Sequence, residues 1–355
     1  CVYLGERECS IQRRNQKVIE EAPSPFLDEK TRVAMGEQSC ALAKAVGYTS
    51  AGTVEFIVDK NRNFYFLEMN TRLQVEHPVT ELITGIDLVE QMIRIATGEK
   101  LNFSQKSIKL NGWAMESRLY AEDPYRNFLP SIGRLTRYRP PAESVEKDCI
   151  IRNDTGVYEG GEISMFYDPM IAKLCTWSSD REKAITAMEN ALDRFEIEGI
   201  GHNLPFLSAV MGHSRFKSGN ITTAFIDEEY PDGFRGVIPS DGIQDILSAT
   251  ALIITRMKMK RISERDSTFD NPVPKKDNLV IRINRENTNV TICDHQDGYE
   301  ISLDDKMILA SIKHELGDSL AEVAIDDISY AVKVNPVIGG YCLRIRGVEQ
   351  IVKVM

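Results

Sequence analysis

The chain has 355 residues, enough for two or three domains, and its 43 Lys and Arg against 53 Asp and Glu give a net charge of −10. An acidic chain argues against nucleic acid as a major partner. No apolar run approaches the roughly 20 residues of a membrane-spanning helix, so we expect no membrane partner. The 7 cysteines are widely spaced and form no Cys-x-x-Cys pair, which favours a reducing compartment over a disulfide framework or a zinc site.

The N-terminal part is predicted to alternate strands and helices. Residues 2–4 are interpreted as the end of a strand. The charge-dense segment 6–21, which contains QRRNQK, is typical of a solvated face of ion pairs. Asp28 is a predicted N-cap for an amphipathic helix over 29–46, and Gly47 is its stop.

Two strands and two helices are expected next. The strands span 51–58 and 64–69, and the residues between them form a turn. Pro78 can begin a helical turn, and a second helix is predicted over 87–97, with Gly98 as its stop.

The middle of the chain shows the same mixture, up to a boundary at Tyr-Pro-Asp-Gly, residues 230–233. The loop 140–148 contains two prolines and a charged stretch. Strands are predicted over 113–120, 132–138 and 170–177, and helices over 181–195 and 204–211.

Beyond residue 236 the pattern changes to one long helix, 242–264, followed by short alternating strands. Such strands at regular spacing indicate an antiparallel barrel or sandwich. The strands are predicted over 279–285, 290–294, 299–303, 308–316, 319–325, 328–335, 340–346 and 349–354. The fold class is therefore α+β.

The segment EMNTRLQVEHPVTE, residues 68–81, is the most informative one. It follows the apolar run 64–67 and offers carboxylates and an amide that can hold a hard cation such as Mg²⁺. Arg72 can bind a carboxylate-shaped anion with its planar fork, and Glu76 can serve as a base. Cation, anion and base together indicate phosphate chemistry on an oxyacid. His77 is expected to have a hydrogen-bonded structural role.

The strand pair 51–58 and 64–69 adds a second carboxylate to this site. If its turn centres between Asn61 and Arg62, Glu55 faces Glu68, and like charges opposite each other destabilise a sheet unless a cation lies between them. A shifted register with one solvated glutamate is the alternative. Arg118, in the strand-like Glu116-Ser117-Arg118, becomes an anion-binding candidate only if the fold directs it at one.

Several segments together resemble the biotin carboxylase component of biotin-dependent carboxylases, which are ATP-grasp enzymes. The similarity runs unbroken over residues 1–232. Residues 111–135, 214–225 and 228–234 resemble α subunits of the propionyl-CoA carboxylase type more than the acetyl-, pyruvate- or methylcrotonyl-type relatives. The segments that carry the resemblance are CSIQRRNQK, EEAP, AGTVEF, FLEMNTRLQVEHPVTE, ESRLYAEDP and FLPSIGR.

The resemblance implies a role for each site residue. Glu55, Glu68 and Asn70 would hold Mg²⁺ or Mn²⁺ on ATP. Bicarbonate would bind to Lys17, Arg72, Gln74 and the backbone of Val75. Glu76 would deprotonate bicarbonate for attack on the γ-phosphate, giving carboxyphosphate. Arg118 would stabilise the biotin enolate.

The resemblance also implies a domain plan. Residues 1–232 would be the C-terminal lobe of the ATP-grasp enzyme with the biotin carboxylase C-terminal domain. Residues 236–355 would join a carboxyltransferase β subunit in an α/β hetero-oligomer, and the β subunit would select the acyl-CoA. The glycine-rich lid, most of the adenine pocket and the biotin carrier domain are expected outside this sequence, as in a fragment of a longer protein. The compartment would be the bacterial cytoplasm, which we prefer, or the mitochondrial matrix.

Three functions compete. The first is the ATP-dependent biotin carboxylase part of an acyl-CoA carboxylase, propionyl-CoA or another. The second is a non-catalytic assembly fragment that binds the β subunit. The third is another ATP-grasp ligase, which the contiguous RLQVEH disfavours. Met257-Lys258-Met259 matches the core of a biotin-acceptor motif. Because its surroundings predict a continuous helix, we expect the methionines to pack on the barrel and Lys258 to stay solvated and unmodified.

Overall fold

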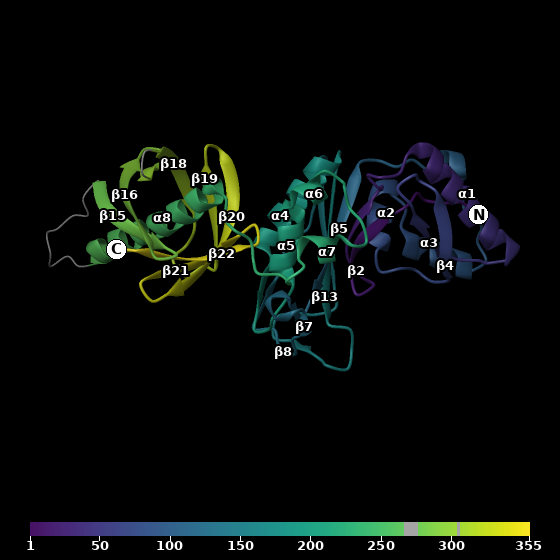
Figure 1. Cartoon of the computed structure of the whole chain (residues 1–355), viewed down its shortest axis with the longest axis horizontal. Coiled ribbons are helices and arrows are strands. Elements are labelled where there is room, and N and C mark those ends of the chain that lie inside the picture. The colour runs from purple at the N-terminus through teal and green to yellow at the C-terminus, as the bar shows by residue number, and fades with distance from the viewer. Residues whose placement is uncertain (266–275, 304–305) are drawn as a thin grey trace. The chain divides into compact units, whose positions relative to one another are not determined.

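The computed structural model describes residues 1–265, 276–303 and 306–355 (Figure 1). The chain divides into two compact units. The first comprises Cys1–Ala191, Ile197–Asn203 and Val210–Gly233, and the second comprises Leu192–Glu196, Leu204–Ala209 and Phe234–Met355.

The first unit is built on a six-stranded antiparallel sheet with the order β1-β2-β5-β13-β11-β10 in the described part of the chain. Its strands are β1 (Glu8–Arg13), β2 (Gln16–Ala22), β5 (Trp113–Tyr120), β10 (Ser144–Val145), β11 (Cys149–Thr155) and β13 (Met170–Ser178). The shorter pairs are β3 (Thr53–Val58) with β4 (Phe64–Asn70), β6 (Glu122–Asp123) with β7 (Leu129–Pro130), β8 (Gly133–Arg134) with β12 (Glu162–Ile163), and β9 (Arg137–Arg139) with β14 (Glu196–Glu198).

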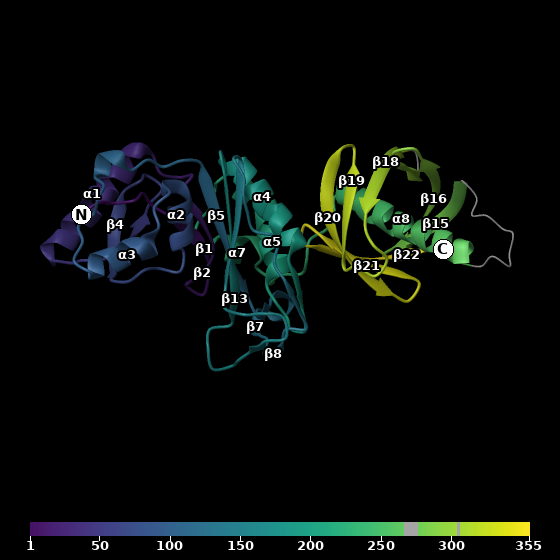
Figure 2. The same ribbon diagram turned by 180° about the vertical axis from the view of Figure 1, so that it is seen from behind.

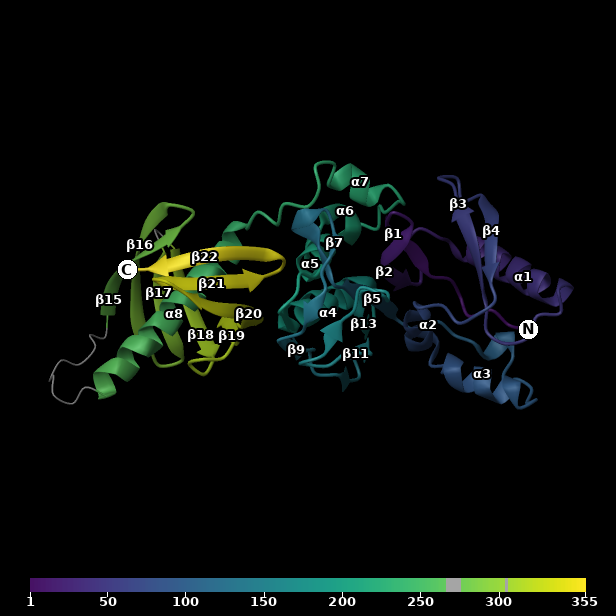
Figure 3. The same cartoon turned by 90° about the horizontal axis from the view of Figure 1, so that it is seen from below.

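Helices surround these strands. Figure 3 shows α1 beside the β3–β4 hairpin, and α2 packs on β2, β5 and β13. The helices of this unit are α1 (Glu29–Ala45), α2 (His77–Thr84), α3 (Leu88–Ala96), α6 (Ser214–Lys217) and α7 (Phe225–Glu229), with most of α4 (Arg181–Arg194). As predicted, Asp28 caps α1 by accepting the backbone N–H of Thr31. Asp87, predicted as the first residue of its helix, is instead the N-cap of α3 and accepts the backbone N–H of Glu90.

The hairpin β1–β2 corrects two expectations. Residues 2–4 are not in a strand, and the segment predicted as a solvated charged face forms paired strands whose residues are mostly half-buried or buried, except at the turn. Arg14 and Asn15 form its two-residue turn with φ of 50° and 64°, a geometry that matches the twist of paired strands. Arg13 pairs with Glu122 at 2.9 Å and lies over the Phe128 ring. Arg13 and Lys17 form ion pairs within the fold. The high density of charged residues in this segment therefore did not predict its exposure to solvent.

The other strands and helices that were predicted for this unit are present, with one of them divided, and several short elements were not predicted. The strand expected over 132–138 is broken into β8 and β9, which pair with different partners. The strand β11 was not predicted, because its alternation is interrupted by Arg152, Asn153 and Asp154.

The second unit confirms the predicted barrel. In the described residues its strands close in sequence order, and β15 pairs with β22. The strands are β15 (Lys276–Ile283), β16 (Glu286–His295), β17 (Gly298–Leu303), β18 (Lys306–Lys313), β19 (Leu320–Ile325), β20 (Ile328–Val337), β21 (Gly340–Ile345) and β22 (Val348–Val354). Most of α5 (Leu204–Gly212) also belongs to this unit.

The long helix α8 (Asp241–Arg265) shares one core with the barrel (Figure 2). Every residue from 246 to 254 is buried, so the barrel strands surround the helix over this stretch. Arg256 is fully buried and pairs with Asp277 and Asp294. No helix of the described residues combines the length and apolarity that a membrane crossing needs.

Candidate active site

The β3–β4 hairpin places Glu55 directly opposite Glu68, as predicted, but by a different route. Near the turn, Val58 pairs with Phe64 and Phe56 with Phe66, so the turn centres on Asn61. A bulge at Leu67 then shifts the register by one residue and brings the two glutamates face to face. The bulge therefore decides the position of Glu68.

The two carboxylates are linked by one amide. Asn70 Nδ2 donates to Glu68 Oε1 at 2.8 Å and lies 3.4 Å from Glu55 Oε1. Glu55, Glu68 and Asn70 thus supply hard oxygen donors, and a divalent cation would relieve the repulsion between the carboxylates. Among the described residues there is no metal-type cluster of three or more His, Cys, Asp or Glu. The oxygens of Glu55, Glu68 and Asn70 can supply part of the ligand shell of a hard cation.

A second group of side chains lies beside this pair and centres on Lys17 and Glu76. Lys17 Nζ donates to Glu55 Oε1 at 2.9 Å and to Glu76 Oε1 at 2.5 Å. Gln74 Nε2 donates to Glu55 Oε1 at 2.6 Å. Lys17 is on β2 and Glu76 is the N-cap residue of α2, so the fold brings together residues far apart in sequence.

Arg118 closes the other side of Glu76. It projects from β5, its Nη2 donates to Glu76 Oε2 at 2.8 Å, and it also pairs with Glu20. The side chains of Glu76 and Arg118 are only 3% and 8% exposed. Their ion pair is therefore shielded from solvent, and its loss would cost more free energy than the loss of an exposed pair.

Arg72 and Val75 lie farther from this centre. Arg72 is exposed, and its guanidinium donates to Asn70 Oδ1 and to the carbonyl oxygen of Leu73, both at 3.3 Å. The carbonyl oxygen of Val75 accepts a hydrogen bond of 2.9 Å from Lys173, which also pairs with Asp154. His77 Nδ1 lies 2.9 Å from the carbonyl oxygen of Gln74, which agrees with a structural role.

The charges around Glu76 control its protonation. Burial raises the pKa of Glu76, but Arg7, Lys17 and Arg118 outweigh burial and lower the pKa below the ordinary carboxyl value. Burial lowers the pKa of Lys17, yet its interactions with Cys9, Glu76 and Glu55 raise the pKa above the usual value. Glu76 is consequently ionised and Lys17 is protonated at neutral pH.

Sequence reasoning missed several residues of the site. Arg7 donates to Gln74 Oε1 at 2.6 Å and to Thr53 and Thr80 at 3.0 Å, which ties three segments together. Cys9 Sγ lies 4.0 Å from Glu76 Oε1. Glu20 could have been found from the run Val-Ile-Glu-Glu-Ala. This run is typical of a strand, and in a strand its two glutamates point to opposite faces. No local pattern marks Arg7 or Lys173, since their contacts depend on sheet order.

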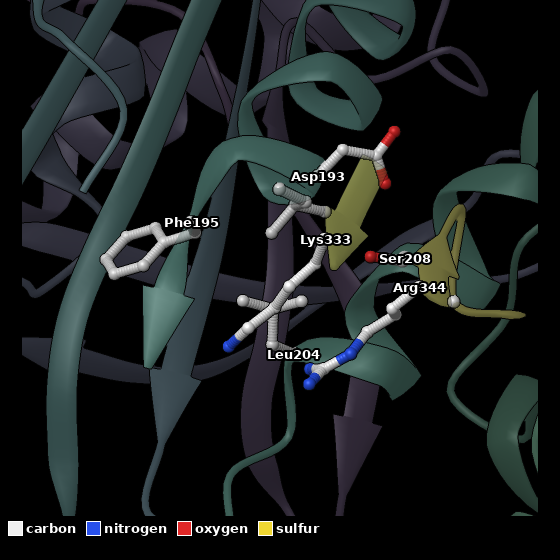
Figure 4. Close-up of a pocket in the computed structure, with 8 residues that line it drawn as sticks. Asp193, Phe195, Leu204, Ser208, Lys333 and Arg344 are labelled. Carbon is white, nitrogen blue, oxygen red and sulfur yellow. The ribbon is translucent and has the colours of Figure 1, made fainter. Parts of the chain in front are cut away.

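A small pocket in the second unit is separate from these residues (Figure 4). Its lining includes Asp193, Phe195, Leu204, Ser208, Lys333 and Arg344. It contains none of the predicted site residues.

Known proteins are similar to this chain along most of its length. Residues 1–104 match the family "Carbamoyl-phosphate synthase L chain, ATP binding domain", residues 116–228 match "Biotin carboxylase C-terminal domain", and residues 247–355 match "Propionyl-coenzyme A carboxylase BT domain". The propionyl-CoA carboxylase alpha chain of Ruegeria pomeroyi is 58% identical over 98% of this chain and 54% of its own length. The chain belongs to the family of biotin-dependent carboxylase alpha chains.

Other members of this carboxylase family are also similar. The mitochondrial propionyl-CoA carboxylase alpha chain of Mus musculus is 46% identical over 94% of this chain and 46% of its own length. The biotin carboxylase domain of a thermophilic 2-oxoglutarate carboxylase, solved with bicarbonate, is 46% identical, with a TM-score of 0.62 over 64% of this chain and 50% of that one. The chain spans about half the length of these relatives.

Proposed function

We propose that this chain carries the bicarbonate-activating and biotin-carboxylating site of a propionyl-CoA carboxylase alpha subunit. One observation carries the proposal: the buried carboxylate of Glu76 is held between Lys17 and Arg118, next to the opposed carboxylates of Glu55 and Glu68. A base between two cations, beside a pair of metal-type ligands, suits the attack of a small oxyanion on a metal-bound phosphate.

Glu55, Glu68 and Asn70 are the residues that would hold Mg²⁺ or Mn²⁺. When bound, the ion supplies charge neutralisation at the phosphates of ATP. Glu68 is exposed, whereas Glu55 is engaged by Lys17 and Gln74. The hairpin therefore presents one fixed and one open carboxylate.

Bicarbonate would bind to Lys17, Arg72, Gln74 and the backbone of Val75. Glu76 takes the proton of bicarbonate, and an oxygen of the resulting dianion attacks the γ-phosphorus while the bond to the ADP oxygen breaks. Carboxyphosphate forms and then separates into CO₂ and phosphate. The phosphate takes the proton from the ureido nitrogen of biotin, and that nitrogen bonds to the carbon of CO₂.

The cations around Glu76 keep its carboxylate deprotonated at neutral pH, and the same lowered pKa makes it a weak base. Its pKa is lowered by Arg7, Lys17 and Arg118. A bound bicarbonate would draw on the same cations, and its negative charge would raise the basicity of Glu76 at the moment of proton transfer. Arg118, already 2.8 Å from Glu76, is positioned to stabilise negative charge on biotin.

The remaining parts of the proposal concern partners and compartment. Biotin would arrive on a carrier domain, and residues 236–355, with their helix-filled barrel, would contact a carboxyltransferase β subunit in an α/β hetero-oligomer. The family match of residues 247–355 supports this assignment. We also propose that residues 1–232 and 236–355 act as the carboxylase and joining domains. Relatives that are bacterial or mitochondrial favour those two compartments.

A pure assembly role is not favoured, because Cys9, Lys17 and Arg118, from three separate segments, converge on Glu76 in a way that joining two subunits does not require. The test uses the full-length gene product. We expect ATP cleavage that depends on both bicarbonate and Mg²⁺, and carboxylation of biotin. A protein that binds its β subunit but cleaves no ATP under these conditions would support the assembly role.

A further inference from the structure

A pair of buried carboxyl groups lies behind Arg118. Glu20 of β2 is directly opposite Glu116 of β5 in the antiparallel sheet, and both are 0% exposed. Glu116 is opposite Cys175 of β13, whose Sγ lies 3.4 Å from Glu116 Oε2. Two ionised carboxylates in this arrangement would repel each other without water to screen them.

In the described residues, Glu20 and Glu116 both pair with the same cation, Arg118. Arg118 pairs with Glu20, donates to Glu76 at 2.8 Å, and has its Nε 3.9 Å from Glu116 Oε1. In the described structure, neither oxygen of Glu20, nor Oε1 of Glu116, accepts a hydrogen bond of good geometry. One guanidinium thus faces three carboxylates. Glu76 also accepts a hydrogen bond from Lys17, whereas Lys17 acts on Glu20, and Lys173 on Glu116, through its charge. A proton between Glu20 and Glu116 would supply the missing donor and remove one charge.

Other titratable groups face the pair from each neighbouring strand and from α2. In the described residues, the two lysines among them direct their hydrogen bonds elsewhere, Lys17 to Glu55 and Glu76 and Lys173 to the carbonyl oxygen of Val75. The groups are Cys9 of β1, Lys17 of β2, Tyr120 of β5, Lys173 of β13 and Glu76 before α2.

We propose that Glu20 and Glu116 share a proton at neutral pH and that Glu20 is a positioning residue, which holds Arg118 in place for the reaction at Glu76. This inference rests on the proposed function. Glu20 does not touch a reacting atom and acts through Arg118. Its contact fixes the Nη2 end of the guanidinium, which is the end that binds Glu76.

The protonation of the pair agrees with this geometry. Burial raises the pKa of Glu20 to about 7, and burial followed by the charge of Glu20 raises the pKa of Glu116 well above its ordinary value. The pair therefore binds a proton more readily than two exposed carboxylates would, and Glu20 titrates near pH 7. Once ionised, Glu20 binds Arg118 through a charge-assisted contact, which is stronger than a neutral one.

The first test compares Glu20→Gln with the wild-type full-length gene product over pH. A neutral glutamine resembles protonated Glu20, so the rates of biotin carboxylation should be similar about one unit below the pKa of Glu20. About one unit above it, the wild type should be about 10-fold faster, a typical loss when support of a functional group is removed. A merely structural role would give a ratio of rates that does not change with pH.

Glu21→Gln is the matched control. Glu21 is the next residue of β2, is equally buried, and binds Arg181 and Trp113 instead of Arg118. Its ratio to wild type should not change with pH. If Glu20→Gln and Glu21→Gln give the same pH-independent ratio, the positioning role is wrong.

The second test reads the proton without activity. Infrared difference spectra of protein with ¹³C-labelled glutamate should show a protonated carboxyl band at neutral pH that is lost in Glu116→Gln. A second band should titrate near pH 7 in the wild type and be absent in Glu20→Gln. A wild-type spectrum without these bands overturns the shared proton. Absence of bicarbonate-dependent ATP cleavage in the wild type would instead contradict the proposed function and leave this spectrum readable.

Discussion

Glu76 receives hydrogen bonds from two cations on different strands, Lys17 Nζ at 2.5 Å and Arg118 Nη2 at 2.8 Å, and the relationship between Glu76 and Arg118 defines the site. Lys17 also reaches Glu55, so the base, the anion-binding cation and the metal-type hairpin form one continuous network. Changes at different points of this network should therefore affect different steps of the reaction.

Replacing the base tests its chemical role. Glu76→Gln in the full-length gene product should lower bicarbonate-dependent ATP cleavage by about 10²–10⁴-fold, the range for a lost general base, and leave the affinity for Mg-ATP nearly unchanged. Steady-state ATP cleavage and equilibrium nucleotide binding measure the two effects. Turnover within about threefold of wild type would show that Glu76 is not the base.

Removing the open ligand of the hairpin should have a different signature. Glu68→Ala should raise the Mg²⁺ concentration needed for half-maximal nucleotide binding, because it deletes a charged oxygen donor. We expect a shift of about 10-fold in a Mg²⁺ titration. Glu90→Ala, at an exposed glutamate of α3 that pairs with Arg94, is the control and should not shift the titration. An unchanged Mg²⁺ dependence in Glu68→Ala would refute the shared-cation interpretation.

Arg118 should separate the two half-reactions. Arg118→Ala should spare nucleotide binding and lower biotin carboxylation by about 10²–10³-fold, as when one stabilising donor is removed from an anionic transition state. Arg118→Lys keeps the charge but not the fork, and should recover only part of the rate. If ATP binding and biotin carboxylation fall equally, Arg118 serves the structure of the site.

The buried pair also predicts how stability depends on pH. The pKa of Glu20 is raised by burial from 4.5 to about 7, so between these values the folded protein binds more protons than the unfolded chain. Stability should therefore fall as pH rises across this window, and Glu20→Gln should flatten the fall. Urea unfolding followed by tryptophan fluorescence reports this unit selectively, because the 2 tryptophans, Trp113 and Trp177, lie on β5 and β13. An equally steep fall in Glu20→Gln would contradict the assignment.

Lys258 should not carry biotin. Met257-Lys258-Met259 lies within α8, Met257 packs against the barrel core, and the Lys258 ammonium lies 4.6 Å from the centroid of the Tyr341 ring. The helix is as predicted, but Lys258 is half-buried instead of solvated, because a cation is attracted to the ring face. Streptavidin blotting of this 355-residue chain, co-expressed with a biotin ligase, should be blank. A biotin adduct on Lys258 would require the helix to open.

The sequence by itself determined the elements whose signals are local. Asp28 caps its helix because a side-chain oxygen needs only the next turn, and the barrel strands follow from alternation and turn residues. The functional segment 68–81 was also recognisable, because its residue types are close together in sequence.

Only the tertiary structure decided which charges meet. Arg118 gained its role when sheet order placed β5 between β2 and β13, and the same order buried Glu20 against Glu116. The pairing of Glu68 with Glu55 depended on a bulge at Leu67, which no local sequence pattern predicted. Contacts between distant strands depend on the packing of the whole sheet, so residue types within one segment cannot specify them.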